Sequence, residues 1–205
     1  SRKTGRLGGR TERDRILVCG STGPGEEAVC LDLYRSLKAR HPSLRLVIVP
    51  RKPERFDEVA QLIESRGFTL GRRSKRTTGE IVLIDTIGEL RKAYALAEVV
   101  FVGRSLVDLG PRQHGSDMIE PAALGKPVAV GPHTGNFDQA VRAFVQANAM
   151  RVVPDSAALL ALLGVWLDNP SDARRVGDRA REVVRASQGA TGRVTDWVVR
   201  HLASR

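Results

Sequence analysis

The chain has 205 residues, of which 41% are hydrophobic and 27% charged, so it is long enough for one domain with a substantial apolar core. No stretch approaches the roughly 20 apolar residues that a transmembrane helix needs, and no secretory signal opens the chain, so we expect a soluble domain. The two cysteines, Cys19 and Cys30, are too few for a disulfide framework and are expected to be buried free thiols.

The formal net charge of +10 is concentrated in two places. Residues 1–15 hold six Arg or Lys against two acids, and we interpret residues 1–14 as a basic disordered arm or an artificial chain edge, and 15–205 as the folded domain. A second cluster is expected in a solvated loop: Arg72, Arg73, Lys75 and Arg76. Such a surface suits phosphorylated substrates or anionic lipid. Aromatic residues are only 4% and none is interleaved with the basic clusters, which argues against nucleic acid.

Short apolar runs alternate with longer amphipathic stretches along the chain. The runs predict strands at 16–19, 46–49, 81–84, 99–102, 128–130 and 151–153. The stretches between and after them predict helices at 24–40, 53–66, 87–96, 136–147, 155–167, 171–187 and 190–202. The strands are uniformly apolar, as strands covered on both faces are. The sequence therefore predicts an α/β fold with a single Rossmann-like, doubly wound parallel sheet.

Ligands of such sheets bind beyond the carboxyl ends of the strands, so the residues that follow each strand are the candidates. After the first strand, Ser21, Thr22 and Gly23 form a candidate phosphate loop that leads into a helix. The sequence is neither the dinucleotide fingerprint nor a P-loop, and a tight turn is the alternative. After the second strand, Arg51 is placed to grip a phosphate, unless it is a solvated loop residue.

Two later strands are followed by acidic residues near helix starts. After the third strand, Asp85 or Thr86 is a candidate cap for the next helix, and Gly88 with Glu89 is a candidate nucleoside contact. After the fourth comes a Gly- and Arg-rich loop that enters the helix containing Glu120. That carboxylate suits the hydroxyls of a ribose, and we prefer this role to catalytic acid or base.

Two histidines lie in the loops after the fourth and fifth strands. His114 and His133 have no metal-ligand spacing, so we interpret them as ordinary loop residues and predict no metal site.

Five ordered motifs together resemble bacterial 3-deoxy-D-manno-octulosonic acid (Kdo) transferases. They are Gly-Ser-Thr at 20–22 with Gly-Glu-Glu at 25–27, Val-Pro-Arg-x-Pro-Glu-Arg-Phe at 49–56, Asp-Thr-x-Gly-Glu-Leu at 85–90, Phe-Val-Gly-x-Ser-Leu-Val at 101–107, and 120–137, which begins Glu-Pro-Ala-Ala. The resemblance covers 15–202. It implies the C-terminal half of a GT-B glycosyltransferase, a family that moves Kdo from CMP-Kdo to a lipid A precursor.

The resemblance also implies which residues contact CMP. They are Pro50, Arg51, Ile87, Gly88, Glu89, Asp117, Met118, Ile119 and Glu120. It implies no cofactor other than the donor substrate and no catalytic residue in this chain. The catalytic base, the acceptor groove and the membrane anchor belong to an N-terminal domain in the family. The parent protein is expected at the cytoplasmic face of the inner membrane, where the basic arm either meets anionic lipid or is simply solvated.

The sequence departs from the family pattern between residues 104 and 117. Arg104 stands where the family has a second glycine, the following loop is longer, and Asp117 replaces an asparagine. A carboxylate at 117 would repel a ligand phosphate. Two alternatives therefore stay open: a half-domain for another donor such as a UDP-sugar, or a non-catalytic module that has lost its ligand. The chain by itself is expected to be inactive.

Overall fold

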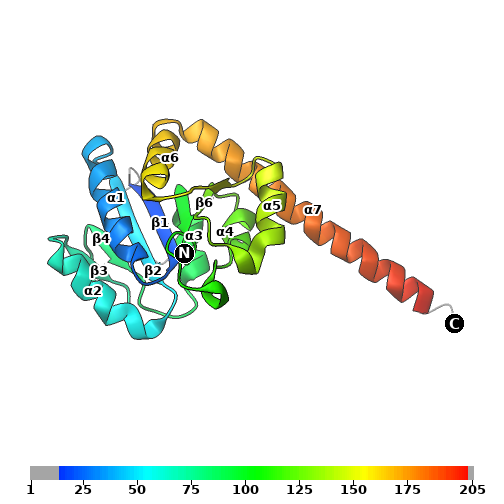
Figure 1. The fold of residues 1–205 in the computed structure, drawn as a ribbon, viewed down its shortest axis with the longest axis horizontal. Helices are drawn as coiled ribbons and strands as arrows, with labels where there is room; N and C mark the ends of the chain where they lie inside the picture. The colour runs from blue at the N-terminus through cyan, green and yellow to red at the C-terminus, as the bar shows by residue number, and fades with distance from the viewer. Residues whose placement is uncertain (1–13, 203–205) are drawn as a thin grey trace, which may run out of the picture.

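The computed structural model describes residues 14–202, and the side-chain surroundings of all these except 111 and 189–202. Seven strands form one sheet in which every neighbouring pair is parallel, in the order β3-β4-β2-β1-β5-β6-β7 (Figure 1). Their bounds are β1 Arg15–Thr22, β2 Leu44–Pro50, β3 Leu70–Arg72, β4 Ile81–Leu83, β5 Val99–Val102, β6 Val128–Val130 and β7 Arg151–Val152. The predicted doubly wound α/β sheet is confirmed, whereas the basic arm falls almost wholly outside the described residues.

The chain reverses its direction across the sheet at β1. From β1 it adds β2, then the edge strand β3, and then β4 between these two, and it returns to add β5, β6 and β7 on the other side. The neighbours β1 and β5 therefore flank the switch point, where the loops that leave them diverge and ligands of open α/β sheets bind.

Helices cover both faces of the sheet. Their bounds are α1 Glu26–Arg40, α2 Phe56–Ser65, α3 Leu90–Leu96, α4 Ile119–Ala123, α5 Asp138–Gln146, α6 Ser156–Asp168 and α7 Pro170–Leu202, with 3-10 turns at Pro53–Arg55, Pro111–Gln113 and Gly135–Phe137. Alternate β1 residues face opposite layers: Leu17 packs in the core under α1, α2 and α6, and Val18 in the core under α3, α4, α5 and α7. This two-sided burial is the reason for the uniformly apolar strands.

The strand β3 is absent from the sequence prediction, which placed its Arg72 in a solvated loop. Leu70–Arg72 pairs with β4 and adds an edge strand. It offers no apolar run, because Gly71 lies at its centre. The segment that returns to β4 passes very close to it: a Cβ on Gly79 would lie 2.3 Å from the backbone nitrogen of Gly71. Only glycine at 79 permits that approach.

Several helix boundaries differ from those predicted. The helix expected from 53 opens with a 3-10 turn and becomes α-helical at Phe56, and the one expected from 87 begins at Leu90. The two helices expected at 171–187 and 190–202 are one continuous helix, α7, whose second half projects away from the body (Figure 1). Gly189 does not break it, because glycine inside a helix costs only about 1 kcal/mol.

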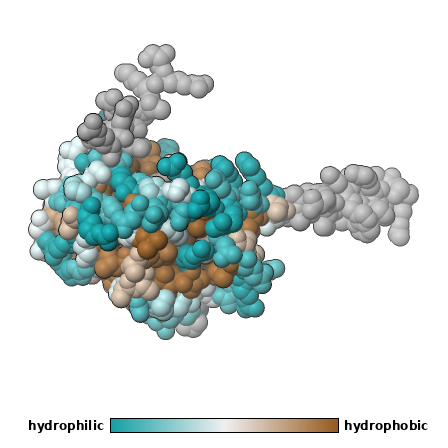
Figure 2. Space-filling view, turned by 90° about the horizontal axis from the view of Figure 1, so that it is seen from above, coloured by the Kyte–Doolittle hydropathy of each residue, from teal (hydrophilic) through white to brown (hydrophobic). Residues whose placement is uncertain are grey.

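The surface carries both hydrophilic and hydrophobic areas. Seen from the side on which α6 lies, a band of hydrophobic side chains crosses the middle of the face (Figure 2). On α6 itself, Val165 is 53% exposed. Among the described residues, no helix combines the length and the apolar character needed to cross a bilayer.

Candidate functional site at the carboxyl ends of the strands

A hollow of about 200 Å³ lies where β2 and β4 end. It is lined by Ser21, Val49, Pro50, Arg51, Pro53, Phe56, Thr86, Ile87, Gly88 and Leu90. Four of the predicted nucleotide contacts, which come from two segments more than thirty residues apart, therefore converge on one concave surface: Pro50, Arg51, Ile87 and Gly88. The fold thus brings these four residues together, and their contact with a nucleotide stays a prediction.

The two sides of this hollow are held differently. On one side, the amide of Arg51 donates to the carbonyl of Thr22 at 3.0 Å, which fixes the backbone while the guanidinium stays exposed. On the other side, Ile87 is 84% exposed, and Gly88 has a φ of +81° that favours glycine. A large apolar side chain so exposed beside a concave surface is suited to pack against a flat ligand group.

Glu89 completes this side of the site. Its carboxylate accepts hydrogen bonds from Arg73 at 2.8 and 2.9 Å and from the hydroxyl of Thr86 at 2.6 Å. These bonds hold the pKa of Glu89 at about 2, so it is an anion at neutral pH. Arg73 lies in the turn after β3, as expected of a loop residue, but it is not a solvated side chain: it is two-thirds covered and pairs with a predicted site residue.

The helix cap expected from Asp85 or Thr86 is also wrong. No side chain caps α3, and Thr86 instead orients Glu89. Asp85 accepts from the amide of Ser74, the hydroxyl of Ser74 and the guanidinium of Arg72, at 2.6 to 2.7 Å. Burial opposes its ionisation, but these hydrogen bonds outweigh it and lower the pKa of Asp85. Asp85 and Glu89, the two acids that follow β4, therefore hold the edge strand β3 and the turn after it in place.

A buried carboxylate fills the switch point between β1 and β5. Glu26, fully buried at the start of α1, accepts hydrogen bonds from four backbone amides. The donors are Gly23 at 2.9 Å, Arg104 at 2.6 Å, Ser105 at 2.9 Å and Leu106 at 2.9 Å. In the sequence, Glu26 appeared only as part of the Gly-Glu-Glu motif at 25–27. Its actual role is to join the loops that leave β1 and β5.

This arrangement argues against part of the candidate phosphate loop. The amide of Gly23 is bound to the carboxylate of Glu26, so it is not free to bind a phosphate. Ser21 and Thr22 are buried, with Ser21 at a φ of +55°. Of the three residues only Ser21 lines the hollow. The hydrogen bond of Gly23 favours the alternative interpretation, a tight turn, although the buried hydroxyl of Thr22 has no hydrogen-bond partner among the described residues.

The neighbouring glutamate has a structural role that the sequence did not disclose. Glu27 is fully buried and pairs with Arg55 at 2.6 and 3.2 Å, and Arg55 also reaches Glu58. Burial lowers the pKa of Arg55, but its hydrogen bonds with Glu27 and then Glu58 outweigh this and raise it. The arginine of the Pro-Glu-Arg-Phe motif thus fastens the loop after β2 to α1, which positions Arg51.

The segment from Asp117 to Glu120 lies outside the lining of this hollow. Met118 is fully buried, so its side chain cannot meet a ligand. Ile119 lines a different hollow together with Phe144 of α5 and Val184 of α7. Asp117 accepts from the amide of Ile119 at 2.8 Å. Glu120 lies in the first turn of α4 and is partly exposed, as predicted, so it is the member of the segment best placed to face a ligand.

Arg104 adopts a conformation that favours glycine. Its φ is +56°, and its amide donates to Glu26. The glycine that the resemblance implies at this position would adopt that geometry without strain. Arginine at 104 has the same backbone conformation, at the energetic cost of a left-handed residue with a Cβ.

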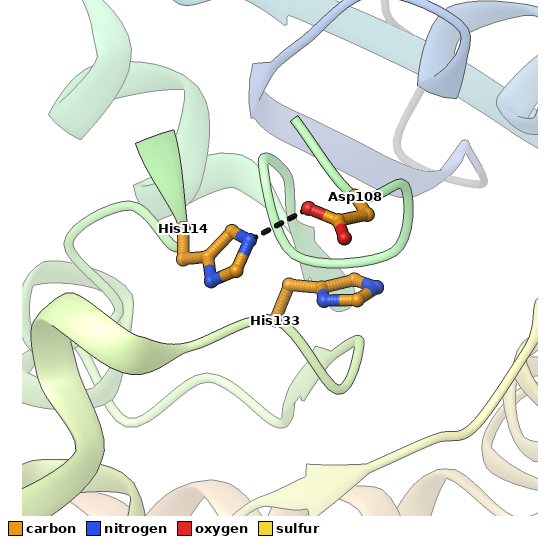
Figure 3. A group of neighbouring side chains, drawn as sticks. All are labelled: Asp108, His114 and His133. Atoms are coloured by element: carbon orange, nitrogen blue, oxygen red, sulfur yellow. Dashed lines mark hydrogen bonds and ion pairs between the residues drawn. The ribbon is translucent and has the colours of Figure 1, made fainter. Parts of the chain in front are cut away.

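The long loop after β5 brings together residues that the sequence kept apart. Nε2 of His114 lies 2.8 Å from Oδ1 of Asp108, and the rings of His114 and His133 are 5.0 Å apart (Figure 3). Both histidines lie in loops, as expected, but they are not isolated from each other.

The architecture and motifs are matched by known proteins. The C-terminal CMP-Kdo binding domain of WaaA from Acinetobacter baumannii superimposes with a TM-score of 0.77 at 31% identity, over 84% of this chain and 90% of that one. The chain belongs to the Kdo transferase family. It corresponds to the C-terminal half of the GT-B fold, which confirms the resemblance drawn from the five motifs.

Two curated members of the family agree. The 3-deoxy-D-manno-octulosonic acid transferases of Haemophilus influenzae and Bordetella pertussis are 34% identical over 197 residues and 35% identical over 190 residues. These alignments include 93% and 88% of the chain, which spans 45% and 43% of the two relatives. No protein-family model matches the sequence.

Proposed function

We propose that this domain binds CMP-Kdo and serves as the donor half of an enzyme that transfers Kdo to a lipid A precursor. The observation that carries the proposal is the convergence of Pro50, Arg51, Ile87 and Gly88 on one hollow at the carboxyl edge of the sheet. Arg51 is the exposed cation there and would hold the phosphate. Ile87 would pack against the cytosine ring, and Glu120 would bind the ribose hydroxyls.

The proposed reaction divides between two domains. A base on the facing N-terminal domain removes a proton from an acceptor hydroxyl, the oxygen attacks the anomeric carbon of Kdo, and the bond from that carbon to the phosphate oxygen breaks. The negative charge gathers on the departing CMP phosphate, where the Arg51 guanidinium stabilises it. We place the parent protein at the cytoplasmic face of the inner membrane, where its lipid acceptor lies.

Nucleotide titration tests the donor. We expect CMP to shift the backbone NMR signals of Arg51, Ile87 and Gly88, while those of Arg40 and Asp168, which pair at the opposite end of the molecule, stay still. Binding should be weak, because the facing domain's contacts are not supplied. Shifts confined to Arg40 and Asp168 would refute the site. A preference for UMP or UDP would favour a UDP-sugar donor, and no response to any nucleotide would favour a non-catalytic module.

Activity tests the division of labour. The purified chain mixed with CMP-Kdo and a lipid A precursor should give no glycosylated lipid by mass spectrometry, because positioning by both domains lowers the barrier by several kcal/mol. Addition of the N-terminal domain of a relative should restore product. Turnover by the chain alone would show that the second domain is dispensable.

A further inference from the structure

The loops after β5 and β6 bring two imidazoles and a carboxylate to one point. Asp108 and His114 belong to the first loop and His133 to the second, and the side chains lie close together in Figure 3. One ligand atom from each lies within 4.8 Å of the other two. Residues so far apart in sequence meet here only because the fold places the two loops side by side.

The backbone around these three residues is firmly tied. The amide of His133 donates to the carbonyl of Ser105 at 2.8 Å, and the hydroxyl of Ser105 accepts from the amide of Gly131 at 2.8 Å. The amide of Gly115 donates to the carbonyl of Arg104. The cluster is therefore carried by two loops that are bonded to each other, which holds in place the backbone from which its side chains project.

Gly115 and Gly110 shape the loop that carries Asp108 and His114. Gly115 has a φ of +78°, and a Cβ there would lie 3.2 Å from Phe137 and 3.3 Å from Thr134, in the segment that follows His133. The amide of Gly110 donates to Oδ1 of Asp108 at 2.8 Å. These contacts bring His114 against His133 and aim the Asp108 carboxylate at His114.

The three groups form a recognised donor set for a late divalent metal. Two imidazole nitrogens and one carboxylate oxygen are ligands that Zn²⁺ accepts, with water or an anion as the fourth ligand. Bonds of about 2.0 to 2.1 Å put neighbouring ligand atoms of a tetrahedral ion about 3.3 Å apart. The separation from Asp108 to His114 is already shorter than this, and the widest one closes by rotation of side chains. The side chain of Asp108, 63% exposed, is free to make that rotation.

We propose that Asp108, His114 and His133 form a Zn²⁺-binding site that joins the loop after β5 to the loop after β6. Its three ligands differ from the residues that line the nucleotide hollow: they lie on the β5–β6 side of the switch point, whereas the hollow lies where β2 and β4 end. An ion held here would fix the 103–116 loop, which is the part of the chain that departs most from the family pattern.

Titration of the tag-free chain with zinc chloride is the first test, by calorimetry at neutral pH. We expect one ion per chain, and at least about tenfold weaker binding for His114→Gln, His133→Gln and Asp108→Asn. His41→Gln is the matched control, since it removes an imidazole at the C-terminal end of α1 and leaves the cluster intact. Equal affinities for His114→Gln and His41→Gln, or no saturation of the wild type by 1 mM zinc, would overturn the proposal.

Spectroscopy of the wild-type chain gives an answer that needs no variant. Zinc should shift the imidazole NMR signals of His114 and His133 while those of His41 stay in place. Cobalt bound in place of zinc should give the visible absorption bands of an ion with nitrogen and oxygen ligands. It should give no thiolate-to-metal charge-transfer band, because Cys19 and Cys30 are buried away from the site. Thiolate bands, or shifts at His41 alone, would place the ion elsewhere. Zinc binding without a response to CMP would support this proposal and not the proposed function. A response to CMP without zinc binding would support the proposed function and not this proposal.

Discussion

The guanidinium of Arg73 grips the carboxylate of Glu89 with two hydrogen bonds, of 2.8 and 2.9 Å. Arg73 comes from the end of the edge strand β3, and Glu89 from the start of α3. The ion pair orients the Glu89 carboxylate beside the proposed nucleotide hollow, and it stabilises the folded chain electrostatically.

The pH dependence of Glu89→Gln should report this pair. The pKa of Glu89 is about 2 in the folded chain and near 4.5 when unfolded, so its stabilisation is present above pH 4.5 and is lost as pH falls toward 2. At pH 7 we expect the variant to be less stable by roughly 1–2 kcal/mol, after allowance for water that reaches Arg73. Urea unfolding at pH 7 and pH 3 measures this, with Glu54→Gln as an exposed control. A loss of the same size at both pH values would contradict the assignment.

Arg51→Ala should weaken CMP binding without unfolding the domain. Loss of a charge-assisted phosphate contact costs about 1.5–3 kcal/mol, which is roughly 10- to 100-fold in affinity. The matched control is Arg40→Ala: this side chain is 67% exposed and pairs with Asp168 at the far end of α1. Calorimetry should find Arg40→Ala close to wild type. Equal affinities for the two variants would remove Arg51 from the site.

Arg104→Gly should be more stable than Arg104→Ala by about 1 kcal/mol. The backbone at 104 is left-handed, which costs a residue with a Cβ about 1–2 kcal/mol, and the flexibility of glycine in the unfolded chain returns part of this. Both variants lose the same side chain beyond Cβ, so their difference isolates the backbone term. Urea unfolding of the two proteins tests it, and an alanine variant as stable as the glycine variant would show that position 104 carries no strain.

Hydrophobic pattern was enough to predict most of the fold. Six of the seven strands and the order of strand–helix units follow from apolar runs, and the motifs locate Pro50, Arg51, Ile87 and Gly88 at strand ends. Pattern missed β3, because an edge strand with glycine at its centre has no apolar run. It also missed the partners of Glu26 and of His114, which are defined by loops that meet only after the sheet has formed. Local sequence carries no signal for such contacts.

Glu26 gives the sharpest test of how the switch point is built. Its carboxylate is fully buried, and its two oxygens share four backbone amides from the loops after β1 and β5. Glu26→Gln keeps the shape but replaces one oxygen by an NH₂ group, which cannot accept from the two amides that face it. Two buried donors would then lose their acceptor, each at a cost of about 1–3 kcal/mol. We therefore expect a loss of roughly 2–4 kcal/mol in urea unfolding at pH 7, against less than about 0.5 kcal/mol for Glu54→Gln, whose side chain is 68% exposed. If Glu26→Gln unfolded like the control, the two loops would be held together by their packing alone, and the carboxylate would have no structural role at the switch point.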